Sequence, residues 1–189
     1  MDYYLLYKPY GMLSQFTREH PGQTTLADLD FDFPKDVYPV GRLDADSEGL
    51  LLLTNDKAAV KRLLDPKSHV AKTYLAQVEG IPTKEAVEKL QNGVIIKVKK
   101  KPFRTHPAQV RLLAETPQLP DRNPPIRYRK NIPDSWLEIT LTEGKNRQVR
   151  KMCAAVGFPV LRLVRIAFGK WKLGKGDLKE LTPGQVVKV

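Results

Sequence analysis

Residues 40–54, VGRLDADSEGLLLLT, combine a short apolar run with a dense group of acids. The run from Gly49 to Thr54 is too short for a typical helix and is typical of a buried strand. Just before it, the segment carries Asp44, Asp46 and Glu48. The pattern predicts a loop that places acidic side chains beside a buried sheet.

The rest of the chain is predicted to be strands with few helices between them. Apolar runs and alternation predict strands at 3–7, 74–78, 94–98, 137–141, 160–168 and 185–189, with residues 110–114 as the neighbour of the strand at 94–98. Helices are predicted at 57–64, capped by Thr54 or Asn55, from Thr83 to about Gly93, and at 146–157. Five prolines make 116–135 a long exposed loop. This order favours an α+β fold built on a mostly antiparallel sheet.

The charge balance indicates a polyanionic partner. The 189 residues carry 32 Lys and Arg against 21 Asp and Glu, a net charge of +11. A domain this basic commonly binds nucleic acid. The alternative, a basic protein that is merely soluble, is left open by charge alone.

Several classes of protein are disfavoured by composition. The longest purely apolar run, Leu50 to Leu53, is far too short to span a membrane, and the N-terminus has no signal pattern. The one cysteine, Cys153, cannot form an internal disulfide, and no cysteine–histidine cluster has zinc-ligand spacing. We therefore expect a cytoplasmic protein without a metal site.

The predicted helix at 146–157 has one apolar and one basic face. Val149, Met152, Cys153 and Val156 form a core-facing stripe, whereas Arg147, Arg150 and Lys151 share another face. Cations near a helix N-terminus oppose the helix dipole, so folding alone does not favour them. They suit a phosphate backbone or a carboxylate in need of a partner, with a solvated basic face as the alternative. Lys145, Arg162 and Arg165 add to this basic region.

The three acids before Gly49 allow more than one interpretation. Their spacing suits a metal site or paired-carboxylate catalysis, but further oxygen ligands are missing nearby and Arg42 lies only two positions from Asp44. An adjacent guanidinium lowers the pKa of a carboxylate and keeps it ionised. That suits a catalytic nucleophile or base, and equally an ordinary loop salt bridge.

A family resemblance bears on this choice. Gly41-Arg42-Leu43-Asp44 followed by Ser47-Glu48-Gly49-Leu50-Leu51 resembles the catalytic motif of the pseudouridine synthases that act on ribosomal RNA. Further matches follow in the family's order at Lys72-Thr73-Tyr74, at residues 143–152, and at residues 161–165 with Gly169. The opening residues 7–11, YKPYG, also resemble the family's first strand and turn. Together the matches span nearly the whole chain.

The resemblance implies a two-lobed pseudouridine synthase fold, with flanking helices and no separate N-terminal RNA-binding domain, over residues 1–189. It assigns catalysis to Asp44, which would attack the ribose C1′ or take a proton from C2′ to give a glycal. It further implies that Tyr74 stacks on the target uracil, that Arg150 pairs with Asp44, and that Leu163 packs against the base. The chemistry needs no cofactor and no metal.

Substrate binding is expected to involve further cations. Arg42 would contact a phosphate or fill the gap that the flipped base leaves. The remaining expected contacts to RNA are made by Lys145, Arg147, Arg165, Arg127, Arg129 and Lys130. Cations and an aromatic in the proline-rich loop suit irregular or single-stranded RNA.

The same loop resembles that of the type E synthases of the large ribosomal subunit. It therefore predicts large-subunit ribosomal RNA as the partner of a monomeric, cytoplasmic enzyme. Three alternatives are the same chemistry on small-subunit RNA, a non-catalytic RNA-binding assembly protein, and a metal-dependent nuclease. The co-occurrence of Asp44, Tyr74 and Arg150 disfavours the assembly protein, and the missing ligands disfavour the nuclease.

Overall fold

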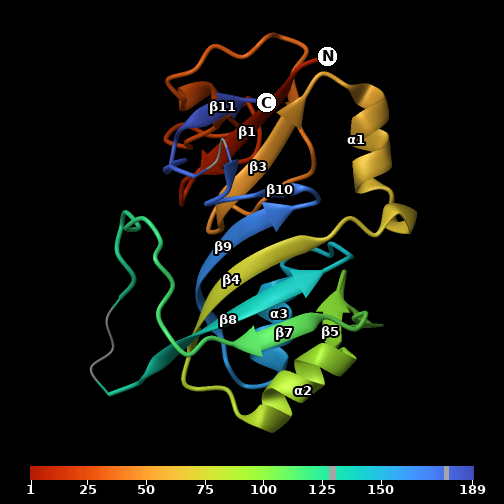
Figure 1. The fold of residues 1–189 in the computed structure, drawn as a ribbon, viewed down its shortest axis with the longest axis vertical. Coiled ribbons are helices and arrows are strands. Elements are labelled where there is room, and N and C mark those ends of the chain that lie inside the picture. The colour runs from red at the N-terminus through yellow and green to blue at the C-terminus, as the bar shows by residue number, and fades with distance from the viewer. Residues whose placement is uncertain (128–130, 177–178) are drawn as a thin grey trace. The chain divides into compact units, whose positions relative to one another are not determined.

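The computed structural model describes residues 1–127, 131–176 and 179–189. The chain divides into two compact units, one formed by residues 1–70 and 164–189 and the other by residues 71–163 (Figure 1). The second boundary falls within a strand, β9 (Val160–Phe168), which begins in the second unit and ends in the first.

The first unit is built around a buried antiparallel pair. Strand β1 (Tyr3–Lys8) pairs with β3 (Glu48–Thr54), with Leu5 opposite Leu52, and on its other side with β11 (Val186–Lys188). The C-terminal part of β9 joins β3 in parallel. The smaller elements are β2 (Tyr38–Pro39), β10 (Trp171–Lys172), the 3-10 turns η1 (Leu26–Asp28) and η2 (Pro66–Ser68), and helix α1 (Lys57–Leu64).

Strand β3 is the centre of this unit's core. All seven of its residues are buried, as are the last five of β1. An aromatic group covers the beginning of β1, where Phe31 and Phe33 each meet Tyr4 edge-on with ring centroids 5.5 Å apart. The prediction of a buried strand directly after the acidic loop is therefore confirmed.

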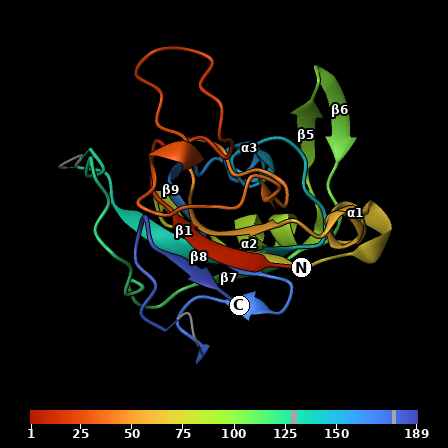
Figure 2. The same cartoon turned by 90° about the horizontal axis from the view of Figure 1, so that it is seen from above.

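The second unit contains an antiparallel part of the sheet, a separate hairpin and two helices. Strand β8 (Asp134–Leu141) lies between β4 (Lys72–Glu79) and β7 (Gln109–Leu112). The hairpin pairs β5 (Ile95–Val98) with β6 (Lys101–Arg104), and the helices are α2 (Lys84–Asn92) and α3 (Gln148–Ala155). Figure 2 shows the hairpin projecting beyond α2.

The core of the second unit joins the sheet to both helices. Leu137 and Ile139 of β8 pack with Leu90 of α2 and with Met152 and Cys153 of α3, all of them buried. Val149 and Cys153 lie on the predicted apolar stripe of α3, and Thr83 caps α2 by accepting a hydrogen bond from Ala86 N at 3.2 Å. These predictions are confirmed.

Three local predictions are wrong. The strand at 94–98 pairs with residues 101–104 and not with 110–112, which pair with β8. The cap of α1 is neither Thr54 nor Asn55 but Asp56, which accepts from Ala59 N at 2.9 Å. Helix α3 begins only at Gln148, because Arg147 has a left-handed backbone with φ of 52°.

None of the helices in the described part of the chain is both long enough and apolar enough to cross a membrane.

Candidate active site

The Asp44 segment forms a tight turn that leads into β3. Ser47 N donates to Asp44 O at 3.0 Å, and the Asp44 side chain is half-buried. Ser14 bonds both backbone polar groups of Leu43, the residue before Asp44. The Ser14 hydroxyl donates to Leu43 O at 2.9 Å and accepts from Leu43 N at 3.0 Å. Because both Ser14 and Leu43 are buried, this pair fixes the backbone from which Asp44 projects.

The other side of the turn is held by residues that follow β1. Gly11 N donates to Ala45 O at 2.7 Å. The ammonium of Lys8, a fully buried side chain, lies 2.6 Å from Met12 O, 3.0 Å from Pro9 O and 3.4 Å from Ala45 O. Lys8 therefore joins the turn after β1 to the turn that carries Asp44.

Burial changes the acid–base behaviour of Lys8. Desolvation lowers its pKa from 10.5 to about 8, and the carboxylates of Glu48, Asp46 and Asp44 partly oppose that change because they attract the ammonium. At neutral pH Lys8 is still mostly protonated. The Lys8 ammonium thus lies next to the acidic turn, where three nearby carboxylates partly compensate its charge.

The start of β3 is fixed by a close approach of two backbones. Gly49 pairs with Arg165 of β9 and has φ of 102°. A Cβ at this position would overlap Arg165 O and stand 2.8 Å from Arg165 N, so only glycine fits. The downstream end of the Asp44 turn is therefore anchored by sheet pairing.

Arg165 itself is buried, although it was predicted to bind RNA. Its Nε donates to Leu50 O at 2.8 Å, and its guanidinium lies 5.0 Å from the centre of the Phe168 ring. These contacts favour a structural role for Arg165. Arg42, by contrast, is exposed, and it donates to the side chain of Gln15 at 3.1 Å.

The other predicted catalytic residues lie in the second unit. Tyr74 is half-buried on β4 opposite Ile139, and it packs against the core. Arg150 is half-buried on α3, with Nη1 3.4 Å from Val160 O. Leu163 is buried within the core of this unit. The apolar and aromatic positions are thus held rigidly by the sheet.

The loop before α3 is organised by Gln148. This buried side chain accepts from Lys145 N at 2.9 Å and donates to Glu143 Oε1 at 2.6 Å. Lys145 and Arg147 remain exposed, and Lys145 Nζ lies 4.9 Å from the centre of the Phe103 ring. The loop therefore presents its cations to solvent from an ordered backbone.

The predicted residues are divided between the two units. Asp44, Arg42 and Arg165 lie in the first unit. Tyr74, Lys145, Arg147, Arg150, Leu163 and Arg127 lie in the second. Arg127 is exposed and borders a cavity of about 170 Å³, whereas Arg129 and Lys130 fall outside the described residues. In the described chain, no three His, Cys, Asp or Glu side chains lie close enough together to hold a metal ion.

Sequence reasoning did not identify Lys8, Ser14 or Gln148 as residues that hold the site. Lys8 was visible only as the end of a strand before Pro9, and its burial depends on carbonyls from a distant turn. Gln148 lies in a matched motif, but its side-chain contacts follow from the fold of the preceding loop.

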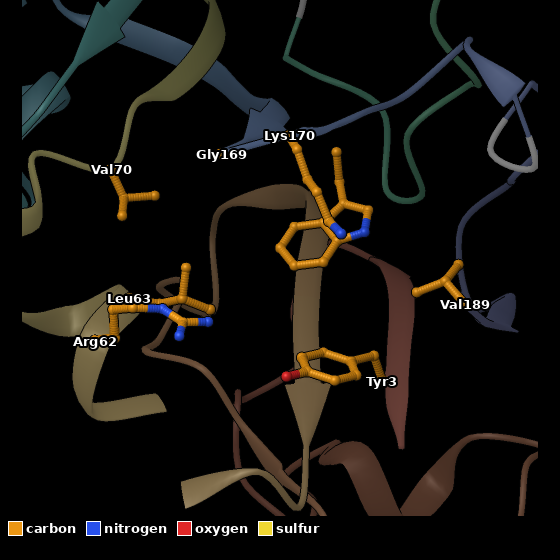
Figure 3. Close-up of a pocket in the computed structure, with 8 residues that line it drawn as sticks. Tyr3, Arg62, Leu63, Val70, Gly169, Lys170 and Val189 are labelled. Atoms are coloured by element: carbon orange, nitrogen blue, oxygen red, sulfur yellow. The ribbon is translucent and has the colours of Figure 1, made fainter. Parts of the chain in front are cut away.

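A cavity of about 500 Å³ in the first unit lies away from the Asp44 turn. Its lining includes Tyr3, Arg62, Leu63 and Lys170 (Figure 3). Tyr3 pairs with Thr54, whereas Lys8 pairs with Gly49, so the cavity and the turn lie at opposite ends of the β1–β3 pair.

The sequence matches a known family of RNA-modifying enzymes. Residues 2–155 match the family model described as RNA pseudouridylate synthase. The chain belongs to this family.

Individual proteins within this family are also similar to the chain. A protein named ribosomal large subunit pseudouridine synthase E, from Xanthomonas axonopodis pv. citri, is 55% identical over 89% of this chain and 86% of its own length. A protein of the same name from Vibrio parahaemolyticus is 50% identical over 94% of this chain and 69% of its own length. A protein named ribosomal large subunit pseudouridine synthase B, from Bacillus subtilis, is 38% identical over 99% of this chain and 70% of its own length.

Solved structures show the same fold. A crystal structure of a pseudouridylate synthase has a TM-score of 0.77 and 27% identity, covering 100% of this chain and 70% of the other. The expected α+β pseudouridine synthase fold is therefore confirmed, and its sheet is mixed, because β3 and β9 run parallel.

Proposed function

We propose that this chain isomerises a uridine to pseudouridine in large-subunit ribosomal RNA, with Asp44 as the catalytic carboxylate. The relatives named large subunit pseudouridine synthase E support the substrate. The observation that carries the catalytic assignment is the Asp44 turn, held on one side by Ser14 and on the other by Lys8 and Gly11. A half-buried acid on a backbone fixed in this way suits attack on a positioned sugar.

The reaction rearranges one bond and one proton. The bond between N1 and C1′ breaks, the base turns, and a bond between C5 and C1′ forms, while C5 loses a proton and N1 gains one. Reactants and products are isomers, so the balance needs no redox partner and no group donor. Asp44 would act at C1′ as a nucleophile or at C2′ as a base.

The second unit would supply the contacts to the base, and it would also supply the cation that pairs with Asp44. Tyr74 offers a ring held by β4 against the core, and base stacking on such a ring contributes about 1–3 kcal/mol. Arg150, whose position on α3 is restricted by its bond to Val160 O, would pair with the Asp44 carboxylate. Leu163 would pack against the base. Arg42, Lys145, Arg147 and Arg127 are exposed and would contact the RNA.

Both units would act as one catalytic domain, and the enzyme would act as a monomer in the cytoplasm, where ribosomal RNA is modified. The RNA pseudouridylate synthase match crosses the boundary between the units and supports the single domain. Size-exclusion chromatography with light scattering would test the monomer, which a dimer mass would contradict.

The decisive experiment measures pseudouridine in large- and small-subunit transcripts treated with the wild type, Asp44→Asn and Asp46→Asn in the presence of chelator. We expect wild-type activity on the large-subunit transcript, no activity in Asp44→Asn, and substantial activity in Asp46→Asn, the matched control from the same turn. Urea unfolding of each variant separates a lost carboxylate from a lost fold.

Each contrary outcome has its own meaning. Activity that survives in Asp44→Asn would refute the catalytic assignment. Activity on the small-subunit transcript alone would refute the substrate and leave the chemistry in place.

A further inference from the structure

The cavity of about 500 Å³ in the first unit is a hollow that the proposed chemistry does not use. Tyr3 lines it and pairs with Thr54, so it lies at the far end of the β1–β3 pair from the Asp44 turn. Cavities of about 300–1,000 Å³ are typical of sites for small molecules. All of its described lining residues belong to the first unit. A ligand bound there would therefore be separate from the nucleotide that reacts.

The walls of the cavity are mostly apolar and include two aromatic rings. The rings of Tyr3 and Trp171 have centroids 6.4 Å apart and planes inclined by 31°. Leu63, Val70 and Val189 add aliphatic surface. Tyr3 and Trp171 are each only half-buried, so part of their ring surface stays accessible. Aromatic surface that the core does not cover suits a ligand with a flat ring system.

The same cavity is bordered by positive charge. Its lining includes Arg62 and Lys170, both exposed, and the described lining residues contain no Asp or Glu. Across the described ranges, neither cation lies at ion-pair distance from a carboxylate. The Lys170 ammonium lies instead 5.0 Å from the centre of the Trp171 ring. Positive charge beside an open aromatic surface favours a ligand that is both planar and anionic.

Hydrogen bonds fix the walls in place. The Tyr3 hydroxyl donates to Asp56 Oδ2 at 2.6 Å, and Asp56 also caps α1, the helix that carries Arg62. Ser68 Oγ donates to Arg62 O at 2.6 Å, and Val189 N donates to Tyr3 O at 2.9 Å. Figure 3 shows the Arg62 side chain extending towards Tyr3. The cavity is thus formed by the fold itself, which lowers the cost of binding a ligand.

We infer that this cavity is a second ligand site, which binds a nucleotide with its base against the rings of Tyr3 and Trp171 and its phosphate at Arg62 and Lys170. Every base has a flat face that stacks on an aromatic side chain, and a guanidinium binds phosphate through two parallel hydrogen bonds. A free mononucleotide and an unpaired nucleotide of a strand share this chemistry. The inference does not depend on the proposed function, because the site contains none of the proposed catalytic residues.

Calorimetric titration with adenosine monophosphate (AMP), adenosine and decanoate tests the chemistry of the site. We expect saturable binding of AMP and at least about 10-fold weaker binding of adenosine, which lacks the phosphate, and of decanoate, which lacks the ring. AMP should also quench the fluorescence of Trp171. The other tryptophan of the chain, Trp136, is buried in the second unit, so Trp171→Phe should remove the quenching and retain the heat of binding.

A pair of double variants tests the cations. Arg62→Gln with Lys170→Gln should weaken AMP binding at least about 10-fold and leave adenosine binding nearly unchanged, which a general loss of structure would not do. The matched control, Lys57→Gln with Lys61→Gln, removes two exposed cations of α1 that lie outside the described lining and should bind AMP like the wild type. Both double variants should form pseudouridine at the wild-type rate.

A titration with a short oligoadenylate separates the two sources of the nucleotide. Binding of AMP shows that a free nucleotide suffices, whereas an oligoadenylate that binds without AMP, and less well to the Arg62 and Lys170 double variant, assigns the site to a strand. Three outcomes would overturn the inference: decanoate binding more tightly than AMP, equal nucleotide binding by the wild type and that variant, or no saturable binding of either nucleotide up to about 10 mM. Each is measured without pseudouridine formation, so failure of the proposed function would be seen separately.

Discussion

The buried ammonium of Lys8 predicts an unusual dependence of stability on pH. Its pKa is about 8 in the fold and 10.5 in a solvated chain, because desolvation disfavours the charged form. Between these values the unfolded chain holds the proton and the folded chain does not. Unfolding therefore takes up a proton, and stability due to Lys8 rises with pH. It is complete above 10.5 and is lost as pH falls through 8.

The size of the effect follows from the two pKa values. Linkage at about 1.4 kcal/mol per pH unit gives a gain of about 2.5 kcal/mol between pH 7 and pH 10. Lys8→Met keeps the length of the side chain and removes the titration. The hydrogen bonds to Met12 O, Pro9 O and Ala45 O are lost as well, which adds an offset.

The assay is urea unfolding of the wild type and Lys8→Met at pH 7, 8, 9 and 10. The free energy of unfolding of the wild type minus that of the variant should increase by about 2.5 kcal/mol across this range. Lys84→Met, at an exposed lysine of α2, should give a difference that stays flat. A Lys8 difference that changes by less than about 0.5 kcal/mol would refute the burial argument.

Three other predictions concern the same framework. Gly49→Ala should destabilise the fold by at least about 3 kcal/mol in urea unfolding, since its Cβ overlaps Arg165 O, whereas Gly184→Ala, with positive φ but open space, should cost about 1–2 kcal/mol. Equal costs would contradict the close approach. Ser14→Ala removes both bonds to Leu43 and should lower kcat more than it raises KM in the transcript assay; an unchanged kcat would contradict its positioning role. The Cys153 thiol is buried, and desolvation raises its pKa to about 12, so a thiol reagent at pH 8 should react only as fast as the protein unfolds, with rates that rise in urea. Rapid labelling without urea would contradict this.

Predictions from sequence succeeded where a local signal decides the structure. The apolar run of β3 and the Thr83 cap of α2 each depend on a few adjacent residues, and both are present. From the sequence alone the role of Asp44 rests on ordered motifs, because the residues of the loop do not distinguish a catalytic acid from a salt-bridged one. The family comparison shows the class of the enzyme and does not test this residue, so the role of the carboxylate stays a prediction for the Asp44→Asn experiment.

Failures occurred where the local sequence opposes the structure it adopts. Strand β6 was missed because residues 99–102 read Lys-Lys-Lys-Pro, and neither lysine pairs nor proline indicate a hairpin. The partner of β5 was therefore sought further along the chain. The burial of Lys8 could not be predicted either, because one of its three acceptors, Ala45 O, comes from a turn 37 residues away.

Two of these unpredicted features, the burial of Lys8 and the turn at Lys99 and Lys100, share a physical cause. At Lys8 the fold desolvates an ammonium, and at Lys99 and Lys100 it holds lysines in a backbone conformation they disfavour. Sequences that fold well usually avoid such conflicts, and those that persist concentrate at functional sites. The first conflict lies next to the turn that carries the proposed catalytic acid, and the second lies at the tip of the β5–β6 hairpin. Relieving the first conflict by Lys8→Met should therefore lower kcat in the transcript assay, because Lys8 joins the turn after β1 to the Asp44 turn.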